Sequence, residues 1–493
     1  VTVGQALQGT TPGVNIINNT GQPGDNPTIR IRGVSSVNAS ASPLIVVDGV
    51  VFQGNLSAIN PNDIASFNIL KDASASALYG SRAANGVIMI NTRTGKAGET
   101  RIELNTSFGI SHRAVPEYNF TGAADYMKLA WEAARFEAED INADNPGTIA
   151  NPGQYASDKL TALDYLAYNP YGVANPIGPD GELVPGAELL WETDWEDAVT
   201  RDQAARQDIS LSISGGNDKT RYFFSGSYLN QEGITITSSF ERFAGRLNLE
   251  TDLKDWLRAG MRTSISYSTQ NYPGQSGNSF SNNIQYIRSM ASIYPLYQRD
   301  ASGDLILDEN GEAVYDFGIK DNNRNVNTQR PVLNPSNLVA TTRLNEYQRE
   351  RFYSSVNAYL EGDITKELSF RTNFAVDSYL FDRFDYDNPE NGAGENVNGR
   401  VKRQKNITNY WTWNNQLTYD KSFGEHNLNV TALAEMYNYK YEFLNAQKTG
   451  FPFIGLTEFN SGATLEDISG YTDHERLLSY MGRVSYNFRN RYF

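Results

Sequence analysis

The sequence predicts a transmembrane antiparallel β-barrel that follows a small N-terminal α+β unit. From about residue 101 onward, apolar and polar residues alternate over segments of about ten residues or more, long enough for a tilted strand to cross a bilayer. Short and long connections alternate between these segments, as in barrels with short turns on one side and long loops on the other. No stretch approaches the roughly 18 apolar residues of a transmembrane helix, which excludes insertion as a helix. A β-barrel remains compatible with the sequence, because its strands need no continuous apolar run.

The composition narrows the classes of function. The 493 residues carry 42 Lys and Arg against 57 Asp and Glu, and this net charge of −15 argues against a nucleic-acid partner, whose phosphates require a basic surface. The absence of Cys excludes disulfide scaffolds, Cys-zinc sites, iron–sulfur clusters and thiol nucleophiles. Motifs of zinc proteases, serine hydrolases, phosphate loops and dinucleotide folds are missing, and His112, His426 and His474 are isolated. The sequence therefore predicts no enzyme activity, no cofactor and no metal site.

Residues 1–98 are predicted to form the α+β unit. Four short segments there have the composition of buried or half-buried strands: 28–33, 44–49, 64–70 and 86–91. Asp72 can cap a short helix over 73–79, and Gly80 stands where that helix should stop. Asp48-Gly49 and Gly86 are predicted to be structural, as turn residues.

Residues 99–493 are predicted to contribute about ten barrel strands. These are placed near 101–113, 207–216, 219–231, 240–253, 257–269, 347–361, 368–381, 405–419, 427–441 and 476–489. In five of them one column of alternate positions is uncharged, while the interleaved column holds charges such as Arg242, Arg246 and Glu435. Tyr and Trp flank the strands, as interfacial girdles do. The long loops are predicted at 114–206, 270–346, 382–404 and 443–475, with an amphipathic helix over 123–139.

Strands of soluble antiparallel sandwiches also alternate apolar and polar residues, so a surface hydrolase built on a soluble β-fold is an alternative. The missing catalytic motifs disfavour it. The acidic residues of the second long loop have a spacing that departs from an EF-hand, and they are interpreted as a solvated loop. These residues are Asp300, Asp304, Asp308 and Glu312.

Several strings in the first region resemble the plug of a TonB-dependent outer-membrane transporter, specifically the SusC-like (SusC/RagA-type) branch of Bacteroidota. They are Gln22-Pro23-Gly24, Ile29 to Gly33, Pro43 to Val50, Lys71 to Gly80 and Ala83 to Ile88. The resemblance implies a barrel of 22 strands around an N-terminal plug, of which this chain would hold about ten. The start of the plug and the TonB box lie outside this numbering.

The resemblance also implies a function. Such a protein imports a large nutrient, an oligosaccharide or oligopeptide, across the bacterial outer membrane, driven by the TonB complex. A SusD-like lipoprotein would serve as the lid, and outer-membrane lipid would surround the barrel. Pairs of transporter and lid would form dimers. The alternative is a structural or adhesive barrel protein without active transport, in which the plug never moves.

Three sets of candidate site residues can be named. Arg30 and Arg32 share one face of a plug strand, and the resemblance implies that plug arginines pair with barrel glutamates, for which Glu435 is the candidate. Polar plug loops can contact ligand, although ordinary turn chemistry explains them as well; the residues are Ser35, Asn38, Ser42, Phe52, Gln53 and Asn55. Aromatic residues of the outer loops can stack on a ligand or fill interfaces: Trp191, Tyr272, Tyr286, Tyr294 and Tyr297.

Overall fold

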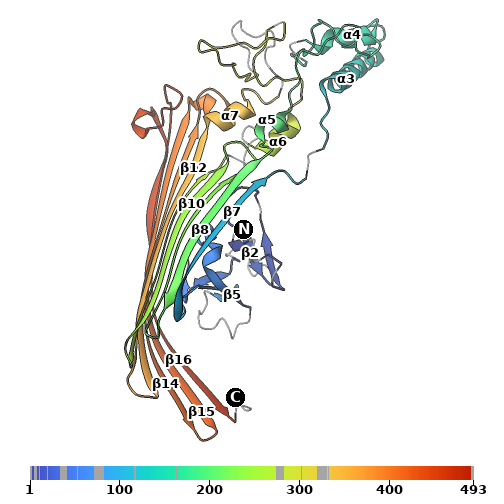
Figure 1. Cartoon of the computed structure of the whole chain (residues 1–493). Helices are drawn as coiled ribbons and strands as arrows, with labels where there is room; N and C mark the ends of the chain where they lie inside the picture. The colour runs from blue at the N-terminus through green and yellow to red at the C-terminus, as the bar shows by residue number, and fades with distance from the viewer. Residues whose placement is uncertain are drawn as a thin grey trace.

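The computed structural model describes the chain apart from residues 1–2, 5–7, 10, 19, 34–40, 53, 72–82, 116–117, 163–164, 274–281, 301, 319–329, 331 and 490–493. Its largest element is a ten-stranded antiparallel sheet in which every strand pairs with its sequence neighbours, and which curves around the N-terminal unit (Figure 1). The strands are β7 (Gly98–Ser111), β8 (Ala204–Gly216), β9 (Thr220–Glu232), β10 (Ser239–Lys254), β11 (Leu257–Asn271), β12 (Glu346–Asp363), β13 (Leu368–Asp387), β14 (Arg400–Phe423), β15 (His426–Thr449) and β16 (Thr464–Phe488).

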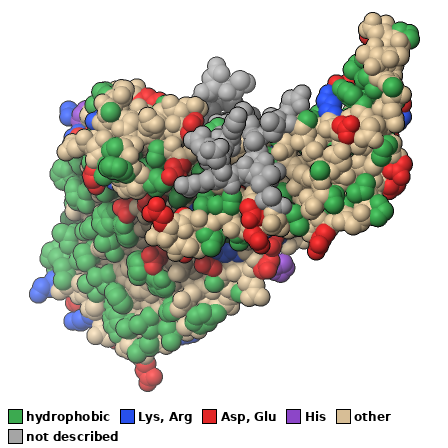
Figure 2. Space-filling view, turned by 90° about the horizontal axis from the view of Figure 1, so that it is seen from above, with side chains coloured by type: hydrophobic (Ala, Val, Ile, Leu, Met, Phe, Trp, Pro, Cys, Tyr) green, Lys and Arg blue, Asp and Glu red, His purple; other side chains and the backbone are tan. Residues whose placement is uncertain are grey.

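The two faces of this sheet have opposite chemistry. Apolar side chains such as Phe243 and Phe374 lie on the outer face and are 50% and 49% exposed, whereas Arg242 and Asp377 face inward and are 3% and 2% exposed. Hydrophobic side chains gather on the convex side of the sheet (Figure 2). A sheet with an apolar outer face and a polar inner face is typical of a β-barrel surrounded by lipid. The predicted membrane β fold is therefore confirmed.

All ten predicted strands are present, but the later ones extend further than predicted. β16 begins at Thr464, so the connection predicted over 443–475 is only 450–463, and β13 and β14 take up much of 382–404. Cross-strand polar pairs hold these extensions together, because the guanidinium of Arg400 donates to both carboxylate oxygens of Glu466 at 2.8 and 2.9 Å. Such water-exposed strand ends lack the apolar column that predicted the rest.

The N-terminal unit contains two small sheets. β1 (Val14–Ile17) pairs with β2 (Thr28–Ile31), and a four-stranded sheet has the order β4-β3-β6-β5, with β3 and β6 parallel. Its strands are β3 (Leu44–Val47), β4 (Val50–Val51), β5 (Ile64–Leu70) and β6 (Val87–Thr92), and short 3₁₀ turns span Leu56–Ala58 and Pro61–Asp63. The helix predicted over 73–79, with Asp72 and Gly80, lies outside the described residues.

The turn predicted at Asp48-Gly49 is confirmed. Both residues have left-handed backbone, with φ of 51° and 89°, which is the geometry of a two-residue hairpin turn between β3 and β4. Asp tolerates this conformation because its short side chain can bond locally, and Gly adopts it freely.

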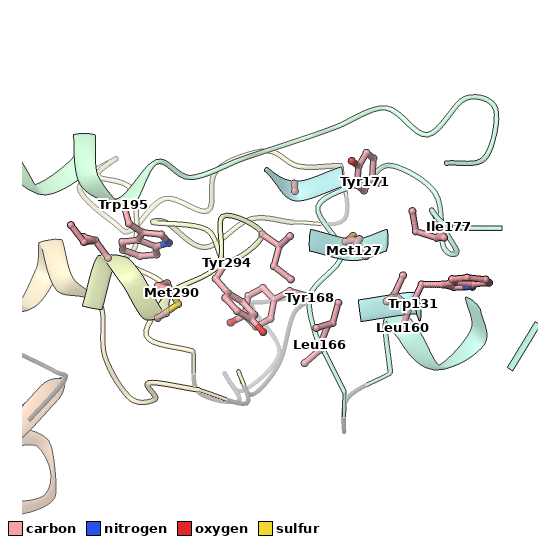
Figure 3. Close-up of a cluster of buried hydrophobic side chains, with 14 of the residues drawn as sticks. Met127, Trp131, Leu160, Leu166, Tyr168, Tyr171, Ile177, Trp195, Met290 and Tyr294 are labelled. Carbon is pink, nitrogen blue, oxygen red and sulfur yellow. The ribbon is translucent and has the colours of Figure 1, made fainter. Parts of the chain in front are cut away.

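The long outer loops carry helices and a hydrophobic core of their own. The helices are α3 (Ala123–Asp144), α4 (Pro152–Leu160), α5 (Trp195–Val199), α6 (Asn283–Ser289) and α7 (Leu338–Leu344). Figure 3 shows Met127, Trp131 and Leu160 of the first loop in the same buried cluster as Met290 and Tyr294 of the second. We call this cluster the outer-loop core. Within the described residues, none of the helices is both long enough and apolar enough to cross a membrane.

Candidate functional site at the interface of the N-terminal unit and the sheet

The most heavily charged contact between the N-terminal unit and the sheet wall joins wall arginines to carboxylates of the unit. Arg246 of β10 places its Nη1 3.4 Å from Oδ2 of Asp48 and its Nε 3.8 Å from Oδ2 of Asp63. On the adjacent strand, Nη1 of Arg262 lies 4.0 Å from Oδ1 of Asp48. The Arg246, Asp48 and Asp63 side chains are all at most 9% exposed, so these ions interact with little screening by water.

The hairpin turn aims the Asp48 carboxylate at the wall. Its Oδ1 accepts a bond from the backbone N–H of Thr92 at 2.9 Å, and its Oδ2 accepts the Thr92 hydroxyl at 2.7 Å. These two bonds fix the carboxylate against β6, so that its outer edge faces β10. The site therefore depends on a turn in one strand pair and on a threonine in a third strand.

Neighbouring wall residues bind the backbone of the unit. Arg242 donates from Nη1 to the carbonyl oxygens of Ser57 and Ile59 at 2.8 and 3.1 Å, and Asn248 donates to the carbonyl of Arg93 at 2.6 Å. Arg242, Arg246 and Asn248 are inward-facing positions of one strand, β10. This strand thus contacts the unit along much of its length.

Further hydrogen bonds reach the unit from other strands. Gln270 of β11 donates to the carbonyl of Pro23 at 2.7 Å and to Asp25 at 2.9 Å, and the Tyr410 hydroxyl of β14 donates to the carbonyl of Val51 at 2.6 Å. The interface thus contains polar contacts to four strands of the wall, beside the apolar contact of Phe52 with Tyr353 of β12. A polar interface can separate and take up water at less cost than an apolar core.

Burial changes the acidity of Asp63. Loss of hydration raises the pKa of this carboxyl above its ordinary value of 3.8, and the nearby Ser225, Arg246 and Arg242 oppose the shift only in part. Arg246 therefore faces one carboxylate held by Thr92 and a second whose charge is disfavoured by its surroundings.

Arg30 and Arg32 both donate hydrogen bonds to other residues of the unit. Nη1 of Arg30 donates to the Ser42 hydroxyl at 3.2 Å, and Nη1 of Arg32 donates to the carbonyl of Lys71 at 3.1 Å. Glu435 lines a cavity beside the β3–β4 hairpin. A pairing of these arginines with Glu435 stays a prediction. The ion pairs of Arg246 and Arg262 have the opposite polarity, and the inward column of arginines in β10 and β11 was the sequence signal for them. A plug arginine does pair with a barrel glutamate elsewhere, because Nη1 of Arg93 lies 3.5 Å from Oε2 of Glu103 in β7.

The predicted ligand contacts in the unit are only partly described. Ser35, Asn38 and Gln53 lie outside the described residues. Phe52 packs edge-on against Tyr353 of β12 with ring centroids 5.0 Å apart. Asn55 caps the first 3₁₀ turn by accepting the N–H of Ser57 at 2.8 Å, and Ser42 accepts from Arg30 as above. Ligand contact by these residues stays a prediction.

The outer ends of the strands surround a cavity of about 810 Å³. Among its lining residues are Arg201, Tyr272, Asn283, Arg343 and Tyr347. The amide nitrogen of Asn283 is buried and has no hydrogen-bond partner in the described part of the chain, so it offers a donor to an occupant. Tyr272 is thus the predicted stacking residue that lines this cavity.

The other predicted aromatic residues occupy packed positions. Trp191, Tyr286 and Tyr294 are at most 7% exposed, and Tyr297 stacks on Tyr315 at 5.1 Å. The prediction that these three buried rings stack on a ligand is therefore corrected: they pack within the loops. The two loops fold together, and this removes the rings from solvent.

The acidic loop is built from turns. Oδ1 of Asp300 accepts the N–H groups of Ser302 and Asp304, and Oδ1 of Asp308 accepts those of Asn310 and Glu312, all within 3.0 Å. Hydrogen bonds of its turn lower the pKa of the exposed Asp308 carboxyl. No group of three or more metal-ligating side chains occurs among the residues that the structure describes.

Comparisons with known proteins agree with this architecture. The family model "TonB-dependent Receptor Plug Domain" matches residues 1–87. TonB-dependent receptor P3 of Formosa agariphila is 28% identical over 508 residues, which cover 100% of this chain and 42% of that protein. TonB-dependent receptor SusC of Bacteroides thetaiotaomicron is 27% identical over 514 residues, covering 99% and 44%. The chain thus spans less than half the length of these curated relatives.

Solved structures give the same picture of the fold. The RagAB peptide importer in its closed-closed state superposes with a TM-score of 0.75 at 24% identity, covering 99% of this chain and 51% of that one. The unliganded ferric citrate transporter FecA gives a TM-score of 0.53 at 10% identity, covering 99% and 51%. At these identities the likeness concerns the fold, a unit enclosed by a barrel wall.

Proposed function

We propose that this chain belongs to the SusC-like TonB-dependent receptors of the bacterial outer membrane and that the whole protein actively imports a large nutrient. Residues 1–98 act as the plug and residues 99–493 as the first part of the barrel. The observation that carries the proposal is the polar interface centred on Arg246, Asp48 and Asp63, which holds the plug with bonds that water can replace.

The nutrient is an oligosaccharide or an oligopeptide, and a SusD-like lipoprotein covers the outer mouth. The wide outer cavity, with its unpartnered Asn283 amide, supports a large hydrogen-bonding ligand. The structurally similar RagAB is described as a peptide importer, which favours a peptide, while the similarity to SusC brings the lipoprotein partner into the proposal. The TonB complex supplies the force, and transporter–lid pairs assemble as dimers.

Removal of the energy source tests the proposal. In the source organism we expect deletion of TonB to abolish uptake of a fluorescent peptide digest or a fluorescent maltodextrin mixture while leaving binding at the cell surface intact. Comparison of the two mixtures identifies the nutrient class. Uptake that continues unchanged without TonB would contradict active import.

A plug–wall disulfide separates import from a purely structural or adhesive role. The chain has no Cys, so paired cysteines at Asn62 and Ser210, whose side chains are in contact at 3.0 Å, form the only possible bridge within it. Oxidation of the Asn62→Cys/Ser210→Cys protein should stop uptake, and reduction should restore it. An adhesive protein would behave the same in both states.

A further inference from the structure

The plug is attached most firmly to one side of the wall. Arg242, Arg246 and Asn248 of β10 hold it, as described above. The connection from plug to wall also lies against this side, because a Cβ on Gly95 would meet the backbone N and O of Tyr222 in β9 at 2.4 Å. Such a close approach excludes any side chain at Gly95. The β8–β11 side therefore anchors the plug.

The β3–β4 hairpin faces a cavity on the side directed toward the later strands of the wall. A space of about 320 Å³ lies between the Asp48–Val51 hairpin and inward-facing residues of β11 to β16. Its wall carries amides on neighbouring strands, since Asn373 of β13 pairs directly with Asn414 of β14, and Asn414 pairs with Glu435 of β15. Successive inward positions of β14 continue this surface along the strand.

These wall residues share uncharged hydrogen-bonding side chains, and we call them the amide track: Asn373, Thr412, Asn414 and Gln416. The Oδ1 atoms of Asn373 and Asn414 are buried and accept no hydrogen bond within the described residues. An unpaired buried amide oxygen costs free energy, so the cavity favours an occupant that donates hydrogen bonds. Hydroxyl groups of a sugar or N–H groups of a peptide have this property, and so does water.

Arg262 connects the cavity to the plug anchor. It lines the cavity and lies beside Asp48, with 3.5 Å from its Nη1 to the Asp48 carbonyl. Movement of the hairpin away from the track would separate Asp48 from Arg262 and Val51 from the Tyr410 hydroxyl. The bonds of Arg242 to Ser57 and Ile59 and the bond of Asn248 to Arg93 involve other plug segments, so this movement leaves them in place. The pair of Arg246 with Asp48 would open together with the hairpin.

We propose that the imported solute passes between the β3–β4 hairpin and the amide track, while the plug stays attached to the β8–β11 side. This proposal rests on the import function and deepens it, because it assigns the passage to one side of the plug. Successive strands lie about 4.8 Å apart and successive inward residues of one strand about 6.8 Å apart, so hydrogen bonds can be exchanged stepwise along the track.

Thiol accessibility in the full-length protein tests the passage. Cells that express Asn414→Cys, with the Cys-free background of this chain, are fed a mixture of peptide digest and maltodextrin and treated with a small membrane-impermeant thiosulfonate cation. We expect several-fold faster labelling in cells with TonB than in cells without it. Two controls accompany it: Asn415→Cys, the next position on β14 on the outer face, and Ser225→Cys, 2% exposed on the anchored side.

Both controls should label slowly in either strain. Labelling of Ser225→Cys as fast as that of Asn414→Cys would mean that the plug leaves the wall all round, and it would overturn the one-sided passage. TonB-independent labelling of Asn414→Cys in cells whose wild-type uptake does require TonB would also overturn it, while leaving import intact. Wild-type uptake that does not require TonB would instead refute the import function itself.

Discussion

At the residue scale, Asp48 combines a backbone role with a charge role. Its left-handed conformation makes the hairpin turn, and its carboxylate faces Arg246 and Arg262. Asn tolerates the same backbone conformation and can still accept the N–H of Thr92, so Asp48→Asn keeps the turn and removes the charge together with one acceptor oxygen. A substitution that preserves the turn can therefore measure how much the ion pairs hold the plug.

We expect Asp48→Asn to weaken plug docking by about 1–3 kcal/mol, because the buried Arg246 and the partly exposed Arg262 lose a carboxylate while Asp63 still faces Arg246. Hydrogen exchange of plug amides in the full-length protein measures the effect. Asp252→Asn, which removes an exposed carboxylate paired with Arg258, is the matched control and should leave plug exchange unchanged. Equal exchange in all three proteins would show that the ion pairs contribute nothing to docking.

Asp63 makes the docking of the plug depend on pH. Its pKa is raised by burial, so the docked plug binds this proton more tightly than the undocked plug does. The resulting stabilisation is complete below the ordinary pKa of the carboxyl and is lost as the pH rises through the raised value.

We expect Asp63→Asn, which mimics the protonated form, to dock at least as well as wild type at neutral pH and to show a weaker dependence on pH. Plug hydrogen exchange, with intrinsic rates corrected for pH, compares the two proteins from mildly acidic to neutral conditions. A variant that docks less well at neutral pH would indicate that attraction to Arg246 outweighs the cost of burying the charge.

At the element scale, the two longest loops behave as one folded body. Arg330 is fully buried, lies 3.7 Å from Asp316 and donates to the carbonyls of Val332 and Leu333 at 3.0 and 2.8 Å. The hydroxyl of Tyr168, from the other loop, donates to Asp316 at 2.9 Å. Burial and the Asp316 charge raise the pKa of the Tyr168 hydroxyl, which keeps it a donor. This network ties both loops to the outer-loop core.

We expect Arg330→Met to destabilise the outer-loop core by about 3–5 kcal/mol, because Asp316 loses its cationic neighbour in a buried site. The barrel strands should be unaffected, since the network lies in the loops. Limited proteolysis of the full-length protein locates the change, and Arg343→Met, at an exposed residue of α7, serves as control. Loops as resistant as in wild type would show that apolar packing alone maintains this core.

The elements also show what sequence patterns can and cannot predict. Strands inside the lipid carry one uncharged and largely apolar column, so the number of strands and the face that each side chain occupies were predictable. The extension of β16 into water has polar residues on both faces. The anchor at Asp48 was missed because a turn motif does not reveal where its carboxylate points. The outer-loop core was missed because it joins residues as distant in sequence as Met127 and Met290.

At the scale of the whole molecule, the two faces of the sheet should respond oppositely to the same substitution. Phe374 and Asn373 are adjacent in β13, yet one is on the outer face and the other lines the cavity beside the hairpin. An arginine on the lipid face near the bilayer midplane costs about 2–4 kcal/mol. On the inner face, arginines such as Arg371 already find a carboxylate, in that case Glu361 at 3.1 Å.

We therefore expect Phe374→Arg to lower the yield of folded full-length barrel in the outer membrane, and Asn373→Arg to fold nearly as well as wild type. The heat-dependent shift in gel mobility of folded barrels measures both variants from the same membranes. Equal yields would contradict the assignment of the convex face to lipid. If Asn373→Arg folds but slows uptake while surface binding persists, it obstructs the cavity that the amide track lines, because its longer cationic side chain occupies the space beside the hairpin.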